Sequence, residues 1–187
     1  MIGTLVNSSS TNQLAGTLAA GWGIVGFAWI LLDAVVRLAA LAIGPLQAGL
    51  TAPQWAALGA FVLFMAYVEG YRGFQRSFAP RTAARAHYLY QHPTWLTGVL
   101  APLFCMGFFK ATQRTLAVAW LGTAMILLLV AGLRVVPQPY RAIVDMGVIV
   151  GLTWGATAFL ACVWREFFAT GTGALPEVPP VVQVGRL

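Results

Sequence analysis

Charged residues are scarce in this sequence. They make up 9% of its 187 residues, whereas 59% are hydrophobic. A soluble domain averages about 25% charged and about 45–50% apolar residues. A soluble fold of this size cannot bury so much apolar surface, because small domains leave a large share of their surface exposed. The composition therefore excludes an ordinary soluble protein and predicts an integral membrane protein.

Cysteine and histidine are also rare, with two of each. Cys105 and Cys162 lie far apart in apolar segments without CxxC spacing, so we predict two buried thiols and no disulfide framework. His87 and His92 are five positions apart, about 140° around a helix, which does not suit a shared metal ion. We predict no metal site, no catalytic residue and no cofactor. Bound lipid is expected, and a pigment or another hydrophobic ligand stays open.

Acidic residues are fewer than basic ones, with 5 against 11, and the net charge is +6. No basic–aromatic RNA-binding motif accompanies this excess, so nucleic acid is not an expected partner. The basic residues gather at the boundaries of apolar segments, where they set topology and meet anionic head groups. Membrane lipids are therefore the expected partners, together with other membrane protein subunits.

Long apolar runs are abundant, and several reach the ~20 residues that a helix needs to cross about 30 Å of hydrocarbon. We predict an all-α, polytopic membrane helix bundle with about five transmembrane helices. A polar N-terminal lead over 1–13, a single transmembrane domain over 14–168 and an extended C-terminal tail over 169–187 make up the chain. The expected spans are residues 14–43, 54–74, 93–109, 116–136 and 142–168. The third is short and contains Pro102, so a kinked or partly re-entrant helix is the alternative there.

The stretch VEGYRGFQRSFAPRTAARAHYLYQHP, residues 68–93, is the least apolar internal segment. Ser77 to Pro80 is expected to end the second span, and an amphipathic interfacial helix is expected over 81–92. The positive-inside rule places the basic loop 72–92 in the cytoplasm of a bacterial inner membrane, and five spans then place the C-terminus outside. The residues expected to anchor this loop at the interface or to dock a partner are Arg76, Arg81, Arg85, His87 and His92.

Asp33, Glu69 and Asp145 lie within or near the ends of predicted spans. A charge at the centre of a span costs roughly 2.5–3.5 kcal/mol, so such residues are candidates for proton or ion handling. Each acid also has an arginine about one helical turn away, and an ion pair that fixes helix packing is the simpler interpretation. Asp33 would pair with Arg37 and Asp145 with Arg141. Glu69 would pair with Arg72 or, across helices, with Arg37.

The segment YLYQHPTWLTG resembles the RHPxYxG segment of the isoprenylcysteine and phospholipid methyltransferases, which are membrane enzymes that use S-adenosylmethionine. His92-Pro93 and the aromatic Trp95 match, while Gln91 replaces the arginine. The paired acidic residues of that family are reduced to the single Glu166. The resemblance implies a cofactor pocket lined by His92, Trp95 and Glu166.

Three functions follow from these patterns. The lack of a catalytic constellation, an internal repeat and a soluble domain favours a non-catalytic accessory or assembly subunit of a larger membrane complex. A small transporter or proton pathway requires at least two of the three acids to face a shared aqueous cavity. A methyltransferase-like enzyme is the third. Gly147, Gly151 and Gly155 form small-xxx-small spacing, which predicts close helix packing within the chain or with another subunit.

Overall fold

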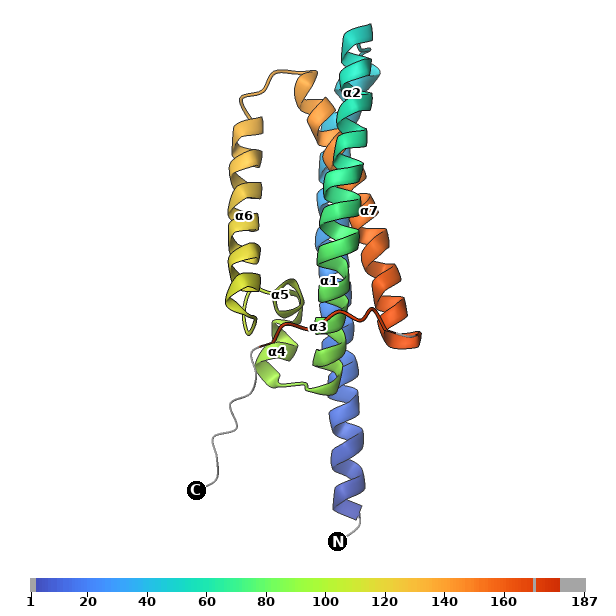
Figure 1. Cartoon of the computed structure of the whole chain (residues 1–187), viewed down its shortest axis with the longest axis vertical. Helices are drawn as coiled ribbons and strands as arrows, with labels where there is room; N and C mark the ends of the chain where they lie inside the picture. Colours follow the sequence, from blue (N-terminus) through green and yellow to red (C-terminus); the bar gives the residue numbers. More distant parts are fainter. Residues whose placement is uncertain (1–2, 170, 179–187) are drawn as a thin grey trace.

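The computed structural model describes residues 3–169 and 171–178, and this part of the chain is all-helical, with no strand. The helices are α1 (Gly3–Gln47), α2 (Ala52–Met65), the π-helix η1 (Ala66–Phe78), α3 (Ala79–Gln91), α4 (Trp95–Val99), α5 (Ala101–Met106), α6 (Gln113–Leu133) and α7 (Tyr140–Phe168) (Figure 1). The all-α prediction is confirmed. Helix α1 begins at Gly3, within the predicted polar lead, and no proline or glycine interrupts residues 4–15. Residues 171–178 of the predicted tail have no regular structure, and 179–187 lie outside the described residues.

Three helices are long and apolar enough to cross a membrane, namely Asn12–Gln47 within α1, α6 and α7. They support a membrane location. The predicted third span is absent as a span, because its residues form the short helices α4 and α5. At about 1.5 Å per residue, neither helix approaches the roughly 30 Å of a hydrocarbon core. The predicted count of five spans is therefore not confirmed.

The predicted break at Ser77 to Pro80 does not occur, since α2, η1 and α3 form one uninterrupted helix from 52 to 91. Pro80 lacks an N–H and its ring crowds the carbonyl of the preceding turn, which normally ends or kinks a helix. Here the preceding turns run in π form, and the N–H of Ala79 donates to the Phe74 carbonyl five residues back. Such π segments are rare and are found frequently at functional sites.

Helix α7 is the central helix of the bundle and packs against α1, α2, η1 and α3. Its glycines let the α2–η1 helix approach closely. A Cβ added at Gly151 would lie 2.6 Å from the Glu69 carboxylate, and at Gly155 it would lie 2.5 Å from the Phe74 ring. The small-xxx-small spacing of α7 is thus used for packing within the chain.

Residues 93–109, which were predicted to form the third span, pack instead against the side of α1. A Cβ at Gly26 would lie 2.4 Å from Pro102, and one at Gly23 would lie 2.9 Å from the Cys105 sulfur. Gly107, with φ of 89°, then ends α5 in the left-handed conformation that glycine adopts without strain. The glycines of α1 therefore provide the groove that holds α4 and α5 on its surface.

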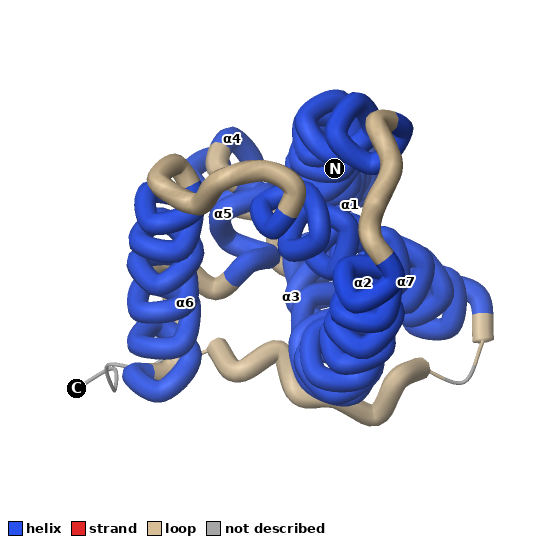
Figure 2. The backbone as a smooth tube through the Cα atoms, turned by 90° about the horizontal axis from the view of Figure 1, so that it is seen from above, coloured by secondary structure: helices blue, strands red, loops and turns tan. Residues whose placement is uncertain are grey.

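Helix α6 stands apart from the other long helices (Figures 1 and 2). It packs extensively against no other helix in the described part of the chain. None of its most apolar stretch is buried, compared with 28% for α7.

Candidate functional site

The course of the chain brings several basic segments to one end of the bundle. The helices α3, α4 and α5, the first turn of α6 and the last turn of α7 all lie at this end (Figure 1). We call it the basic end, because these segments, together with the end of η1 and the loop before α6, carry Arg76, Arg81, Arg85, Lys110, Arg114 and Arg165.

Arg85 was expected at the interface as an anchor, but its side chain is buried, with 1% exposed. Its Nε donates to the Phe104 carbonyl at 2.7 Å, and Nη1 donates to the Pro176 carbonyl at 2.9 Å. Its Nη2 donates to the carbonyls of Phe109 at 3.0 Å and Lys110 at 3.2 Å. These carbonyls lie in short helices and loops, where backbone acceptors lack a full set of helical hydrogen-bond partners. One guanidinium thereby joins α3 to α5, to the loop before α6 and to the C-terminal tail.

The charge of Arg85 persists in this site. Burial lowers the pKa of Arg85 to about 10, so the guanidinium stays protonated at neutral pH. It also lies over the Phe104 ring, 4.2 Å from the ring centroid, in a cation–π contact.

Glu177 joins the tail to the first turn of α6. Its carbonyl accepts from the Thr112 N–H at 3.0 Å, and its carboxylate accepts from the Thr115 hydroxyl. Arg81 approaches the same carboxylate at 3.6 Å and also donates to the Ser77 carbonyl at 2.8 Å. Helix α6 is thus fixed at its base, although its length is unpacked.

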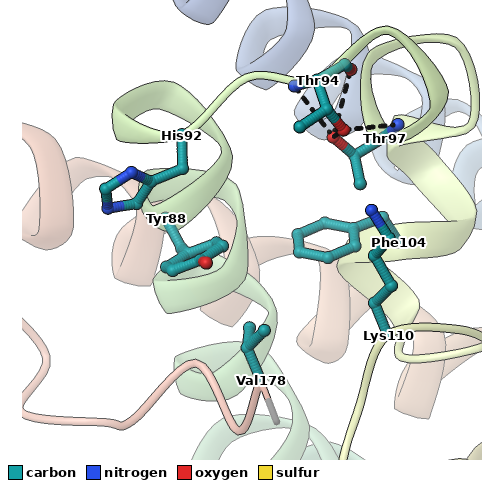
Figure 3. A pocket seen from close by; sticks show the side chains of 7 residues that line it. All are labelled: Tyr88, His92, Thr94, Thr97, Phe104, Lys110 and Val178. Atoms are coloured by element: carbon teal, nitrogen blue, oxygen red, sulfur yellow. Dashed lines mark hydrogen bonds between the residues drawn. The ribbon is translucent and has the colours of Figure 1, made fainter. Parts of the chain in front are cut away.

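A cavity of about 310 Å³ lies between α3, α4 and α5 (Figure 3). The hydroxyls of Thr94 and Thr97 are 2.7 Å apart at one side of it, and the His92 ring lies 4.8 Å from the Tyr88 ring at another. The Lys110 side chain extends beside the Phe104 ring toward the threonine pair (Figure 3). The lining residues are Tyr88, His92, Thr94, Thr97, Phe104, Lys110 and Val178, with no carboxylate among them.

Two of the three predicted ion pairs are present. Arg37 Nε lies 2.8 Å from Asp33 Oδ2 on a partly exposed face of α1. Arg141 Nε lies 3.8 Å from Asp145 Oδ2, a separation too long for a hydrogen bond, and Asp145 is buried with 2% exposed.

Glu69 does not form the expected pair with Arg72. No ion pair of Glu69 occurs among the described residues, and its Oε2 is buried beside Gly151 without a hydrogen-bond partner there. Arg72 is exposed. Neither this cavity nor the second one described below is lined by Asp33, Glu69 or Asp145.

The remaining expected anchors have local partners. Arg76 lies over the Tyr71 ring at 5.7 Å. His87 Nδ1 lies 3.4 Å from Glu166, whose other oxygen accepts from the N–H and the hydroxyl of Thr172, both at 2.7 Å. Glu166 therefore holds the start of the tail against α7.

The residues implied by the methyltransferase resemblance are not brought together around the cavity. Only His92 lines it, while Trp95 is 82% exposed and Glu166 is engaged with His87 and the tail. Within the described residues no group of three or more His, Cys, Asp or Glu side chains could hold a metal ion.

A second hollow of about 310 Å³ opens on the side of α7 and is lined by Ile149, Val150, Thr153, Trp154 and Thr157. Trp154 Nε1 donates to Gln75 Oε1 at 2.7 Å. The hollow is shallow and mostly apolar.

Sequence reasoning did not single out Lys110, Thr94, Thr97 or Glu177. The sequence placed Lys110 only as one of two cations, with Arg114, between two apolar segments. Glu177 gave no signal, because its partners lie more than sixty positions away in the chain.

Comparison of the chain with protein-family models, with curated proteins and with solved structures found no match. The geometry of this chain alone therefore supports the functional proposal.

Proposed function

We propose that this protein is a non-catalytic assembly subunit of a larger membrane complex, and that α6 is the helix that meets its partner. The observation that supports this is the isolation of α6 from the other helices of the described chain. Membrane helices associate through close van der Waals packing and interhelical hydrogen bonds, and lipid tails are as apolar as the helices themselves. A helix that packs against no other long helix forgoes most of this stabilisation unless another chain supplies it.

The surface of α6 suits an apolar partner helix. Leu121 and Leu128 are each 70% exposed, and Met125 is 67% exposed. Gly122 has nothing within 4 Å of the place where a Cβ would stand, so another backbone can approach closely at that point. We call the contacts of Glu177 with Thr112, Thr115 and Arg81 the clamp at Glu177. They hold the first turn of α6 in a fixed place, so that α6 presents a defined surface.

We further propose four spans, formed by α1, the α2–η1 helix, α6 and α7, with the basic end in the cytoplasm of a bacterial inner membrane. Five spans would have placed Lys110, Arg114 and Arg165 outside, against the positive-inside rule. Because α4 and α5 do not cross, these residues lie at the same end as loop 72–92. The charge distribution then favours one orientation, with both ends of the described chain on the cytoplasmic side.

The assembly role is tested by photo-cross-linking in native membranes. A photoreactive residue at Leu121 in α6 is expected to capture one protein partner in a discrete band. The same residue at Leu63 in α2, which is 73% exposed, is the matched lipid-facing control. Gly122→Leu is expected to abolish the band, whereas Gly59→Leu, at an equally open glycine of α2, is expected to leave it. Equal labelling at both sites, or capture of lipid alone at Leu121, would contradict the proposal.

A proton pathway is the second candidate function, and one observation favours it. Glu69 is an acid in the α2–η1 helix with a buried oxygen that has no hydrogen-bond partner in the described chain, and such residues are functional candidates by default. Asp33 and Asp145 each lie beside an arginine, so a chain of free carboxylates has less support. The methyltransferase-like activity rests on His92 alone, and absence of S-adenosylmethionine binding would remove it.

A further inference from the structure

We propose that the cavity between α3, α4 and α5 binds the phosphate head group of an anionic lipid, with Lys110 as its cationic partner. This ligand site is independent of the assembly role proposed for α6. Its support comes from charge, lining chemistry and backbone conformation.

The electrostatic environment of the cavity favours an anion. Lys110 extends toward the cavity, and no carboxylate lines it. Beneath the Phe104 ring lies the guanidinium of Arg85, whose hydrogen-bond acceptors are all backbone carbonyls. A carbonyl satisfies the N–H donors of arginine but does not neutralise its charge. The Glu177 carboxylate does act on Arg85, but it does not line the cavity and it is shared with Arg81 and Thr115, so positive potential still reaches the cavity. Phosphate is bound well by an ammonium group together with hydroxyl donors.

The lining divides into a polar and an apolar part, as a lipid head group with its glycerol does. The hydroxyls of Thr94 and Thr97 and the Lys110 amine form the polar part. The rings of Tyr88 and Phe104, stacked with centroids 6.4 Å apart, form much of the apolar part. The volume of about 310 Å³ lies at the small end of ligand cavities, which fits a head group and not a whole cofactor.

The backbone at Lys110 adds an independent observation. Its φ is 47°, in the left-handed region that residues other than glycine seldom occupy. Such conformations persist only where the surroundings fix them, and they cluster at ligand sites. The Arg85 Nη2 donates to the Lys110 carbonyl at 3.2 Å and to the neighbouring Phe109 carbonyl at 3.0 Å, and these contacts help to fix it.

The test uses the fact that Lys110 is the only lysine in the sequence. Acylation of its side-chain amine, measured by peptide mass spectrometry, reports occupation of the cavity, with the N-terminal amine as an internal reference. The intact protein is placed in phosphatidylcholine nanodiscs, and phosphatidylglycerol is then included in increasing amounts. Parallel samples receive soluble glycerol phosphate or inorganic phosphate instead.

Phosphatidylglycerol is expected to slow acylation of Lys110 about tenfold when present at ten times its Kd, with little effect on the N-terminal amine. Equal slowing of both amines, or no slowing, would overturn the proposal. Protection by soluble phosphate compounds in the absence of phosphatidylglycerol would assign the cavity to a soluble phosphate and overturn the lipid source. Protection already complete in pure phosphatidylcholine would show that the cavity does not select an anion.

Variants separate a specific site from general surface charge. Lys110→Asn removes the charge and retains a residue that tolerates positive φ, and Lys110→Arg retains the charge. Native mass spectrometry is expected to show bound phosphatidylglycerol lost from Lys110→Asn and kept by Lys110→Arg. Arg114→Asn, four positions away, is the control and is expected to keep the lipid. Equal loss in Arg114→Asn would overturn the proposal, and protection of Cys105 from alkylation verifies that each variant is folded.

Discussion

Replacing Arg85 with lysine is expected to release the α4–α5 segment and the C-terminal tail from the bundle. The arginine fork reaches carbonyls in three separate segments, at Phe104, at Phe109 and Lys110, and at Pro176. A lysine ammonium is a single point on a flexible stem and cannot reproduce this geometry.

The expected loss of stability in Arg85→Lys follows from the backbone carbonyls that lose their hydrogen-bond donor. The Phe104 carbonyl keeps the N–H of Gly107 at 3.0 Å, so its loss is small. Lysine can satisfy at most one or two of the other carbonyls, which are partly buried, and each acceptor left unpaired costs up to about 1–3 kcal/mol. A total of about 3 kcal/mol is a large part of the roughly 5–15 kcal/mol by which folded proteins are stable.

Cys105 is the reporter for this prediction. Its side chain is 1% exposed, and burial raises the pKa of the Cys105 thiol to about 12. Alkylation therefore requires local opening, and Cys162→Ser removes the other thiol. A loss of about 3 kcal/mol should speed alkylation of Cys105 on the order of a hundredfold.

Arg81→Lys is the matched control, because Arg81 is partly exposed and bonds to Ser77 within its own helix. We expect less than about a threefold change there, as for most surface substitutions. If Arg85→Lys left the alkylation rate of Cys105 at the control level, the contacts of Arg85 with the carbonyls would not be what holds the α4–α5 segment and the tail in place.

Three further substitutions test the helix packing and the role of Glu69. Gly151→Ala places a Cβ 2.6 Å from the Glu69 carboxylate and should cost about 1–3 kcal/mol, whereas Gly122→Ala meets nothing within 4 Å and should be neutral or raise stability by up to about 1 kcal/mol. Unfolding of both in detergent checks this, and equal effects would contradict the close packing of α7. Glu69→Gln removes a carboxylate whose buried oxygen has no hydrogen-bond partner in the described chain, so we expect equal or higher stability with the amide. Unchanged proton uptake by Glu69→Gln in proteoliposomes would end the second candidate function, and a loss of about tenfold or more would favour it.

The membrane class and the long helices could be predicted from composition, because hydropathy is a property of local sequence. The 93–109 segment could not be placed in this way. It is as apolar as a span, but its position depends on Gly23 and Gly26 of α1, which lie about eighty positions earlier. Their lack of a side chain leaves room for Cys105 and Pro102. Hydropathy alone does not predict which distant helix an apolar segment packs against.

The helical face of α3 could also be predicted, but its surroundings could not. The spacing places Arg85, Tyr88 and His92 on one face, and the structure has Tyr88 and His92 on the cavity with Arg85 beneath it. That face meets protein carbonyls instead of the membrane surface, because the short helices and the tail cover it. The clamp at Glu177 was missed for the same reason, since its partners come from distant segments.

The assembly role is tested most directly by the mass and composition of the protein extracted gently from its native membrane. The account predicts a particle much heavier than the 20.0 kDa chain, with other subunits in fixed stoichiometry, that falls apart in the Gly122→Leu variant. A lone monomer or an assembly of identical copies would contradict it.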